Sequence, residues 1–259
     1  MKAVILCGGK GTRLREETEY RPKPLVTVGS MPILWHIMKI YSHYGINDFI
    51  LCLGYKGGMI KEFFLNFERL TRDFTLDLRS QESRIIHHDT NHLEDWRITF
   101  VDTGEDANTG ARVARIEPFV HGETFCLTYG DGLANINIQE LIAFHKHQGK
   151  IATISGVHPE NTFGIVEHEG GLVKTFREKP RMESTINGGF FVCEPTFFSY
   201  LSQDASCVLE QEPLSHLAKE EKLSVYDHPG FWYCMDTYKH WEELNRRWSS
   251  GAAPWKVWA

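Results

Sequence analysis

Several features that identify whole classes of protein are missing from this chain. It has six cysteines in 259 residues and no Cys-x-x-Cys pair, so neither a zinc ribbon nor a thioredoxin-like redox motif is indicated. No apolar run approaches the roughly 18 residues that a membrane-spanning helix needs. Because the chain opens directly on a strand-like segment, we expect no secretion signal, no membrane partner and a cytoplasmic, reducing location.

A surplus of basic residues is missing as well. The formal net charge is −6, so we expect no nucleic-acid partner. Basic side chains are instead concentrated near the start, at Lys10, Arg13, Arg15, Arg21 and Lys23. A local cationic cluster of this kind suits a small phosphorylated ligand.

The opening segment also lacks two well-known phosphate-binding motifs. An apolar run at residues 3–7 is followed by Gly8, Gly9 and Gly11, and glycine lets backbone N–H groups approach an anion closely. No Lys-Ser or Lys-Thr pair follows, as a P-loop requires, and Leu14 stands where a dinucleotide fingerprint needs glycine. The segment predicts a strand and a phosphate-binding turn of another kind, with a plain surface turn as the alternative.

Strand and helix signals alternate through the first half of the chain. Apolar residues at three- and four-residue steps predict a helix over 32–44, followed by a strand at 49–53 and a helix over 55–67. Further apolar strands are expected at 97–102 and 125–129. This alternation predicts an α/β fold with a Rossmann-like, mixed and mostly parallel sheet flanked by helices. Ligands bind beyond the carboxyl ends of such strands, where the glycine loop falls.

The second half is richer in strand signals and is expected to belong to the same single domain, residues 1–259. We expect strands at 151–157, 163–168, 172–177, 186–193, 223–226 and 231–235, and helices at 137–147 and 212–222.

Residues 69–97 interrupt the pattern and carry several histidines. His88 and His92 stand four residues apart, which would place them on one face of a helix. The intervening Asp-Thr-Asn favours a turn instead, and no second cluster of ligands is evident. We therefore favour a solvated hairpin or a subunit contact over a metal site.

The combination GGKGTRL…PKPL closely resembles the GGxGTRL…PKPL motif of the sugar-phosphate nucleotidyltransferases. The resemblance implies that a nucleoside triphosphate binds along the loop, that Arg13 holds the departing pyrophosphate, and that Lys23 lies between the sugar phosphate and the α-phosphate. The nucleotide-binding residues it implies here are Leu6, Gly8, Gly9, Lys10, Gly11, Thr12, Arg13 and Lys23.

The same resemblance assigns roles further along the chain. Thr109, Gly110 and Arg112 would contact the nucleotide, although Asn108 or Thr109 could simply cap a helix. Asp131 follows a strand between two glycines, a placement that suits a hard divalent cation but also a tight turn. By resemblance, Asp131 and Asp236 bind Mg²⁺, Gly130 and Asp131 join the nucleotide contacts, and the catalytic residues are Arg13, Lys23 and Asp131.

Two short motifs in the second half resemble the sugar-phosphate side of the family's site. Glu178 and Lys179 lie in an EKP tripeptide, and Asn187 and Gly188 lie in a glycine-containing strand. Each motif is weak alone, and their order after the first motif adds weight. The resemblance thus divides the domain into a nucleotide-binding half, about residues 1–135, and a smaller β-rich sugar-binding half, about residues 136–259.

Longer segments, among them TYGDG, INGGFFV and APWKVW, are similar to family members that use CTP and α-D-glucose 1-phosphate. The implied products are CDP-glucose and pyrophosphate. UTP, dTTP, another sugar 1-phosphate or a non-catalytic nucleotide-binding subunit remain alternatives. Lys10, Arg21 and the pair Tyr233-Cys234 depart from the family pattern and bear on the choice of base and sugar. The tryptophan-rich tail, residues 238–258, indicates core packing or a subunit contact. With the charged insert, it leads us to expect a homo-oligomer, a hexamer by resemblance.

Overall fold

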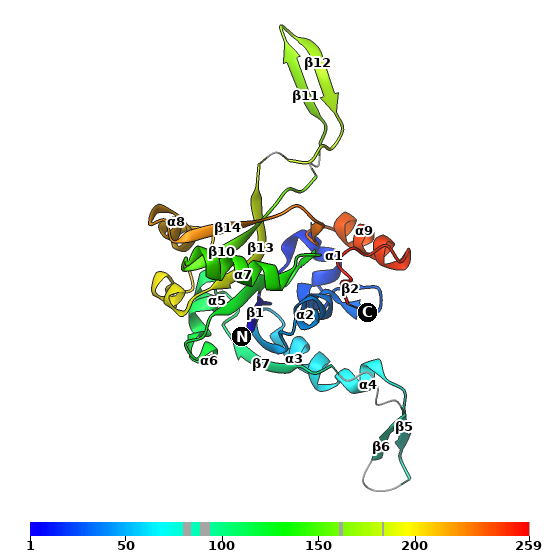
Figure 1. Ribbon diagram of the computed structural model, residues 1–259. Helices are drawn as coiled ribbons and strands as arrows, with labels where there is room; N and C mark the ends of the chain where they lie inside the picture. Colours follow the sequence, from blue (N-terminus) through cyan, green and yellow to red (C-terminus); the bar gives the residue numbers. More distant parts are fainter. Residues whose placement is uncertain (80–83, 89–93, 161–162, 183, 259) are drawn as a thin grey trace.

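A seven-stranded sheet forms the centre of the molecule (Figure 1). The computed structural model describes residues 1–79, 84–88, 94–160, 163–182 and 184–258. The strand order is β14-β10-β13-β8-β1-β4-β7. These strands are β1 (Ala3–Leu6), β4 (Asp48–Leu53), β7 (Arg97–Asp102), β8 (Phe125–Tyr129), β10 (Ala152–Val157), β13 (Ile186–Cys193) and β14 (Leu223–His228).

The sheet is mixed and mostly parallel, which confirms the predicted fold class. β13 runs antiparallel to both of its neighbours, β8 and β10, whereas the other neighbouring pairs are parallel. The strands expected at 97–102, 125–129 and 186–193 form with those bounds. The second half adds β10, β13 and β14 to the sheet begun by the first half, so its strands are not a separate layer.

Helices cover both faces of the sheet because alternate side chains of its strands point to opposite sides. Ala3 and Ile5 of β1 pack in one core, and Val4 and Leu6 in the other. The helices that contribute to the first core are α2 (Ile33–His43), α3 (Gly57–Leu65), α7 (Ile138–Gln148) and α9 (Tyr238–Ser249). Those in the second are α5 (Thr109–Arg115), α6 (Glu117–Val120), α8 (Glu212–Lys219) and the 3₁₀ helix Pro195–Tyr200.

Within the described residues, four two-stranded ladders complete the fold. They are β2 (Thr27–Val28) with β3 (Met31–Pro32), β5 (Phe74–Asp77) with β6 (Arg84–His87), β9 (Gly132–Ala134) with β15 (Trp232–Cys234), and β11 (Ile165–Glu169) with β12 (Leu172–Arg177). Shorter turns of helix are α1 (Arg15–Thr18), α4 (Phe67–Thr71) and the 3₁₀ turns Thr12–Leu14 and Lys23–Leu25. None of the helices within the described ranges has the length and apolarity needed to cross a membrane.

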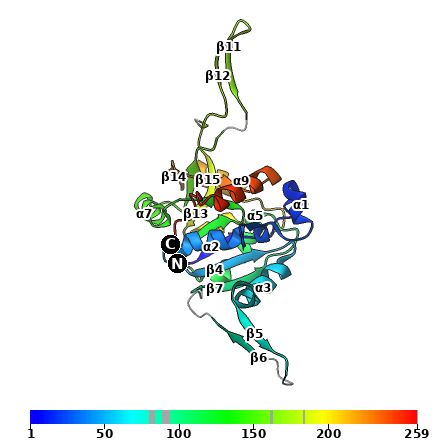
Figure 2. The ribbon, with the colours of Figure 1, turned by 90° about the vertical axis from the view of Figure 1, so that its right-hand side faces the viewer.

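Two of these ladders project from the body in opposite directions (Figures 1 and 2). We call β5–β6 the insert hairpin and β11–β12, with the segments that join it to the sheet, the arm. The insert hairpin bears out the expectation of a hairpin within residues 69–97. His88 bonds through Nε2 to the hydroxyl of Thr75 at 2.8 Å, and His92 lies outside the described residues.

The tryptophan-rich tail packs against α2 of its own chain, so core packing is the better of the two expected explanations. Trp255 is fully buried, and its indole N–H donates to Nδ1 of His36 at 3.4 Å. His36 is also fully buried, and its Nε2 lies 2.9 Å from the carbonyl oxygen of Val28. These two contacts fix the tautomer, with the proton on Nε2, since that nitrogen faces an acceptor.

This buried histidine predicts an acid-sensitive fold. Burial lowers the pKa of His36 from 6.5 to about 4. Between these values the unfolded chain binds a proton that the folded chain does not, so stability falls as the pH decreases through this window. We expect His36 to account for a loss of about 3 kcal/mol between pH 6.5 and pH 4.

The measurement is the free energy of unfolding against pH for the wild type and for His36→Gln. Glutamine can donate to Val28 and accept from Trp255 but does not titrate, so its pH dependence should be shallower. Equal slopes in the two proteins would contradict the assignment.

Candidate active site

A cavity of about 320 Å³ opens at the carboxyl ends of β1 and β8, where ligands bind in open α/β sheets. The glycine loop that follows β1 forms one of its walls. Its lining residues are Leu6, Cys7, Gly8, Gly9, Gly11, Thr12, Arg13, Lys23, Pro24, Ala107, Asn108, Thr109, Arg112, Tyr129, Gly130 and Asp131. Most of the residues expected to bind nucleotide therefore lie together.

Arg112 holds the glycine loop from beneath. Only 4% of this residue is exposed, and its guanidinium donates to the carbonyl oxygens of Gly8 and Leu53, each at 3.0 Å. It also bonds to Gly104 and Glu105, beyond the end of β7. A Cβ atom on Gly8 would lie 2.1 Å from the guanidinium, so glycine is required there for this contact. Arg112 thus fixes three loop segments at the edge of the cavity.

A short antiparallel ladder brings Asp131 and Asp236 together across more than a hundred residues. Asp131 immediately precedes β9, and Asp236 follows β15 after a single residue. Cys234 pairs with Gly132, and the N–H of Met235 donates to the carbonyl of Asp131 at 2.9 Å. The next residue, Thr237, caps α9 by accepting from the N–H of His240.

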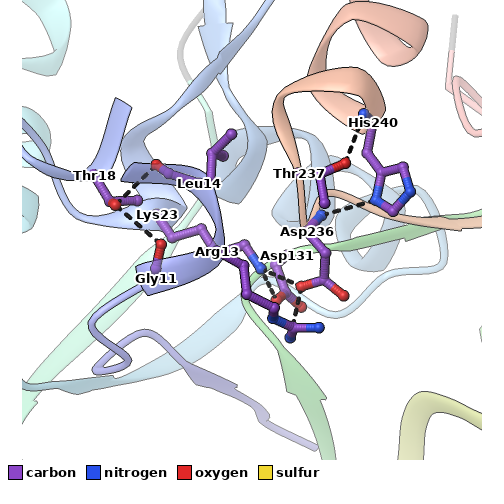
Figure 3. Close-up of polar contacts among 9 residues, drawn as sticks. All are labelled: Gly11, Arg13, Leu14, Thr18, Lys23, Asp131, Asp236, Thr237 and His240. Atoms are coloured by element: carbon purple, nitrogen blue, oxygen red, sulfur yellow. Dashed lines mark hydrogen bonds and ion pairs between the residues drawn. The ribbon is translucent and has the colours of Figure 1, made fainter. Parts of the chain in front are cut away.

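Lys23 lies between the two aspartates (Figure 3). Its ammonium nitrogen is 2.6 Å from Oδ2 of Asp131 and 2.8 Å from Oδ1 of Asp236, and 11% of its side chain is exposed. Arg13 approaches from the open side, with Nη2 2.8 Å from the same oxygen of Asp236. Pro22 and Pro24 restrict the backbone around Lys23. The result is a group of two cations and two anions at the mouth of the cavity.

Burial and neighbouring charges act in opposite directions on the ionisation of this group. Burial alone would lower the pKa of Lys23, but the carboxylates of Asp131 and Asp236 raise it above its ordinary value. Burial would raise the pKa of Asp236, yet Lys23 and Arg13 hold it below the usual range. Burial and the neighbouring Asp131 raise the pKa of the Cys234 thiol. Lys23 and Asp236 therefore keep their charges near neutral pH, and Cys234 keeps its proton.

Asp131, Cys234 and Asp236 are the one group in the described part of the chain whose donor atoms could together hold a metal ion. Their ligand atoms lie within 4.8 Å of one another. Two carboxylates suit a hard divalent cation such as Mg²⁺, which prefers oxygen ligands. The two carboxylates of this group therefore fit the cation that the family resemblance implies.

Some expected site residues lie outside the cavity. Lys10 is paired with Asp106 at 2.9 Å on the surface, and Gly110 faces residues 207–209. Glu178 and Lys179 follow β12 at the base of the arm and are largely exposed, so neither lines the cavity. The order of the EKP motif along the chain therefore did not place its side chains in the cavity.

Asn187 and Gly188 are at the start of β13, next to the cavity wall. Nδ2 of Asn187 lies 3.3 Å from the hydroxyl of Tyr129, and the carbonyl of Gly188 accepts from the indole of Trp232 at 2.6 Å. The capping alternative for Asn108 and Thr109 is not observed, because neither side chain bonds to the first amides of α5.

The structure adds residues that the sequence motifs did not indicate. Tyr129 lines the cavity directly before Gly130 and Asp131. Its position in the TYGDG segment could have identified it as a site residue. Cys234 enters the aspartate group because β15 pairs with β9, and Glu210 bonds to two residues of the cavity wall. No local pattern marks Glu210.

Comparison with known proteins gives consistent matches over the whole chain. Residues 2–242 match the nucleotidyl transferase family. A probable glucose-1-phosphate cytidylyltransferase from Bacillus subtilis (strain 168) is 50% identical over 258 residues, covering 100% of both chains. Glucose-1-phosphate cytidylyltransferase from Salmonella typhi is 46% identical over 260 residues, again covering 100% of both.

Solved structures share the fold at lower sequence identity. A putative glucose-1-phosphate thymidylyltransferase from Bacillus anthracis superposes with a TM-score of 0.71 at 18% identity, covering 98% of this chain and 95% of that one. The family match spans most of the chain, and the relatives align over their full length. This chain therefore belongs to the nucleotidyl transferase family.

Proposed function

We propose that this protein transfers a cytidylyl group from CTP to α-D-glucose 1-phosphate, forming CDP-glucose and releasing pyrophosphate. The observation that carries the proposal is the Lys23 ammonium held between Asp131 and Asp236 at the mouth of the glycine-loop cavity. The names of the two relatives at 46% and 50% identity support the choice of base and sugar.

In this reaction an oxygen of the sugar phosphate attacks the α-phosphorus of CTP. The new O–P bond forms as the bond to the β-phosphate oxygen breaks, and pyrophosphate leaves with that electron pair. The attacking oxygen is already ionised near neutral pH, so no general base is required. Catalysis then consists of positioning and charge neutralisation.

The charges of the four central side chains are balanced, and this has a consequence for catalysis. Lys23 and Arg13 neutralise Asp131 and Asp236. Two phosphorylated substrates bring additional negative charge, so a further cation is needed when they enter. We propose Mg²⁺ held by Asp131 and Asp236, which would supply that charge and shield the phosphates. Lys23 and Arg13 would then turn from the aspartates to the phosphates, Lys23 at the α-phosphate and Arg13 at the leaving group.

The remaining binding roles are proposals on the same basis. The loop from Gly8 to Thr12 would hold the triphosphate, supported by its place in the cavity wall. Asn187 and Gly188 would face the sugar phosphate. Glu178 and Lys179 would join them if the arm moves toward the cavity.

The substrate proposal is tested by pyrophosphate release from CTP, UTP, dTTP and GTP in separate assays with glucose 1-phosphate and Mg²⁺. We expect CTP to be used best. Cytosine has an amino donor where uracil and thymine have a carbonyl acceptor, and unpaired polar groups in a binding site are costly. Excess EDTA should abolish turnover. Preference for another base, or full activity in EDTA, would overturn the corresponding part of the proposal.

Lys23→Ala should lower turnover by about a hundred- to a thousandfold, because one preorganised charge contact to the transition state is lost. Lys23→Arg should not restore it fully, since the planar guanidinium is larger and differently directed. Turnover is measured at saturating CTP and glucose 1-phosphate.

The matched control for this variant is Lys39→Ala. Lys39 is a half-buried lysine of α2, and its Nζ lies 3.0 Å from Oε2 of Glu94. Melting curves of both variants separate catalysis from folding. Near-normal turnover in Lys23→Ala would show that Lys23 is not catalytic, and a collapse of its melting temperature alone would show a structural role.

We also propose that the protein is a cytoplasmic homo-oligomer, a hexamer. All six cysteines are unpaired, as suits a reducing compartment.

Because the tail packs within its own chain, the support for assembly comes from the arm instead. The exposed apolar side chains of the arm are Phe163, Val166, Leu172, Val173 and Phe176. Isolated two-stranded hairpins are marginally stable in water, so a covering partner would stabilise the arm.

Light scattering at micromolar concentration tests the assembly. We expect a mass several times that of one chain for the wild type, and a smaller mass for Leu172→Asp/Phe176→Asp, which places charges on the apolar face of the arm. Phe163 and Val166 are left unchanged so that the hairpin keeps part of its packing. A monomeric wild type would contradict the proposal.

A further inference from the structure

Glu210 joins the two walls of the cavity. One carboxylate oxygen accepts a hydrogen bond from the hydroxyl of Thr109 at 2.7 Å, and the other accepts from the hydroxyl of Tyr129. Thr109 begins α5 and Tyr129 ends β8, and both side chains line the cavity. A single side chain therefore accepts hydrogen bonds from two hydroxyl groups that belong to different elements of the cavity wall.

The main chain before Glu210 is fixed, although its side chain is exposed. The N–H of Asn108 donates to the carbonyl of Ala205 at 2.9 Å, and the N–H of Ala111 donates to the carbonyl of Cys207 at 3.2 Å. Leu209 is fully buried, and its N–H donates to the hydroxyl of Thr109 at 3.0 Å. The hydroxyl of Thr109 is therefore held by the N–H of Leu209 as well as by Glu210, whereas Tyr129 has no bond to Leu209.

Tyr129 passes this constraint to Asn187. The tyrosine hydroxyl donates to Glu210 and accepts from Nδ2 of Asn187 at 3.3 Å. The amide oxygen of Asn187 accepts from the N–H of Gly189 at 2.8 Å, so the orientation of the amide is set from both ends.

The position of the tyrosine ring depends on the backbone beside it. Gly189 has φ +79°, and a Cβ atom there would lie 2.5 Å from Cδ2 of Tyr129. The glycine following Asn187-Gly188 therefore makes room for the ring that orients Asn187. Tyr129, Asn187 and Gly189 form one interlocked group, and Glu210 is its connection to the rest of the wall.

We propose that Glu210 is a positioning residue for sugar-phosphate binding, acting through Tyr129 on the amide of Asn187. This inference rests on the proposed function, in which Asn187 contacts the sugar phosphate. The amide of Asn187 is held at both ends, by Tyr129 and by the N–H of Gly189, only while the carboxylate of Glu210 orients the tyrosine hydroxyl. Without Glu210, the Tyr129 hydroxyl can rotate, and the amide of Asn187 is firmly held only through its oxygen, by Gly189.

The test is steady-state kinetics of Glu210→Ala, Tyr129→Phe and the double variant, with both substrates varied. We expect the KM for glucose 1-phosphate to rise about tenfold in Glu210→Ala, the effect of losing one oriented hydrogen bond. The KM for CTP should change much less, because Thr109 keeps its bond from Leu209. Glu210→Gln should recover part of the loss, since its amide oxygen can still accept from Tyr129.

The double variant separates a positioning role from two independent effects. If Glu210 and Tyr129 act as a unit on Asn187, the double variant should resemble the worse single variant. Glu212→Ala is the control: it removes the same charge two residues away, at the start of α8, and should leave both KM values unchanged.

Each outcome has a distinct meaning. Additive effects, equal rises in both KM values, or an unchanged KM for glucose 1-phosphate in Glu210→Ala would overturn the positioning role. Absence of pyrophosphate release by the wild type would overturn the proposed function instead. If the wild type prefers another sugar 1-phosphate, the KM values are compared for that substrate, and the same outcomes support or overturn the role of Glu210.

Discussion

An ammonium group held between two carboxylates joins three distant parts of this chain. Lys23 belongs to the segment after the glycine loop, Asp131 to the turn between β8 and β9, and Asp236 to the turn before α9. Removing any one of these charges would leave the others poorly balanced in a partly buried place, which is costly. With Arg13 beside Asp236, the two cations and the two anions of this group balance one another.

Arg112 shows how a residue in a binding region can act on the protein itself. Its guanidinium donates hydrogen bonds to backbone carbonyls at or just beyond the ends of β1, β4 and β7. One side chain therefore holds three neighbouring loops together. Glycine at position 8 permits this contact, because a Cβ atom there would collide with the guanidinium.

The two projecting hairpins stand in contrast to this ordered centre. Helices bury the apolar side chains on both faces of the central strands, whereas apolar side chains of the arm are exposed. The EKP motif lies at the base of that arm, away from the cavity. The residues expected to bind the sugar phosphate are therefore less completely assembled than those expected to bind the nucleotide, among which the glycine loop, Lys23 and Asp131 lie together.

The amino-acid sequence alone determined the parts of this protein that depend on local pattern. The apolar runs at 97–102, 125–129 and 186–193 became β7, β8 and β13, and the glycine loop followed β1 as its turn chemistry requires. The family resemblance also predicted that Lys23 and Asp131 would share a site. Tertiary structure decided the rest: the β9–β15 ladder placed Cys234 beside the aspartates, and the docking of residues 205–209 brought Glu210 to Tyr129. Strand and helix periods act over a few residues. These contacts join segments about 80 to 100 residues apart, so they arise only when the fold brings both segments together.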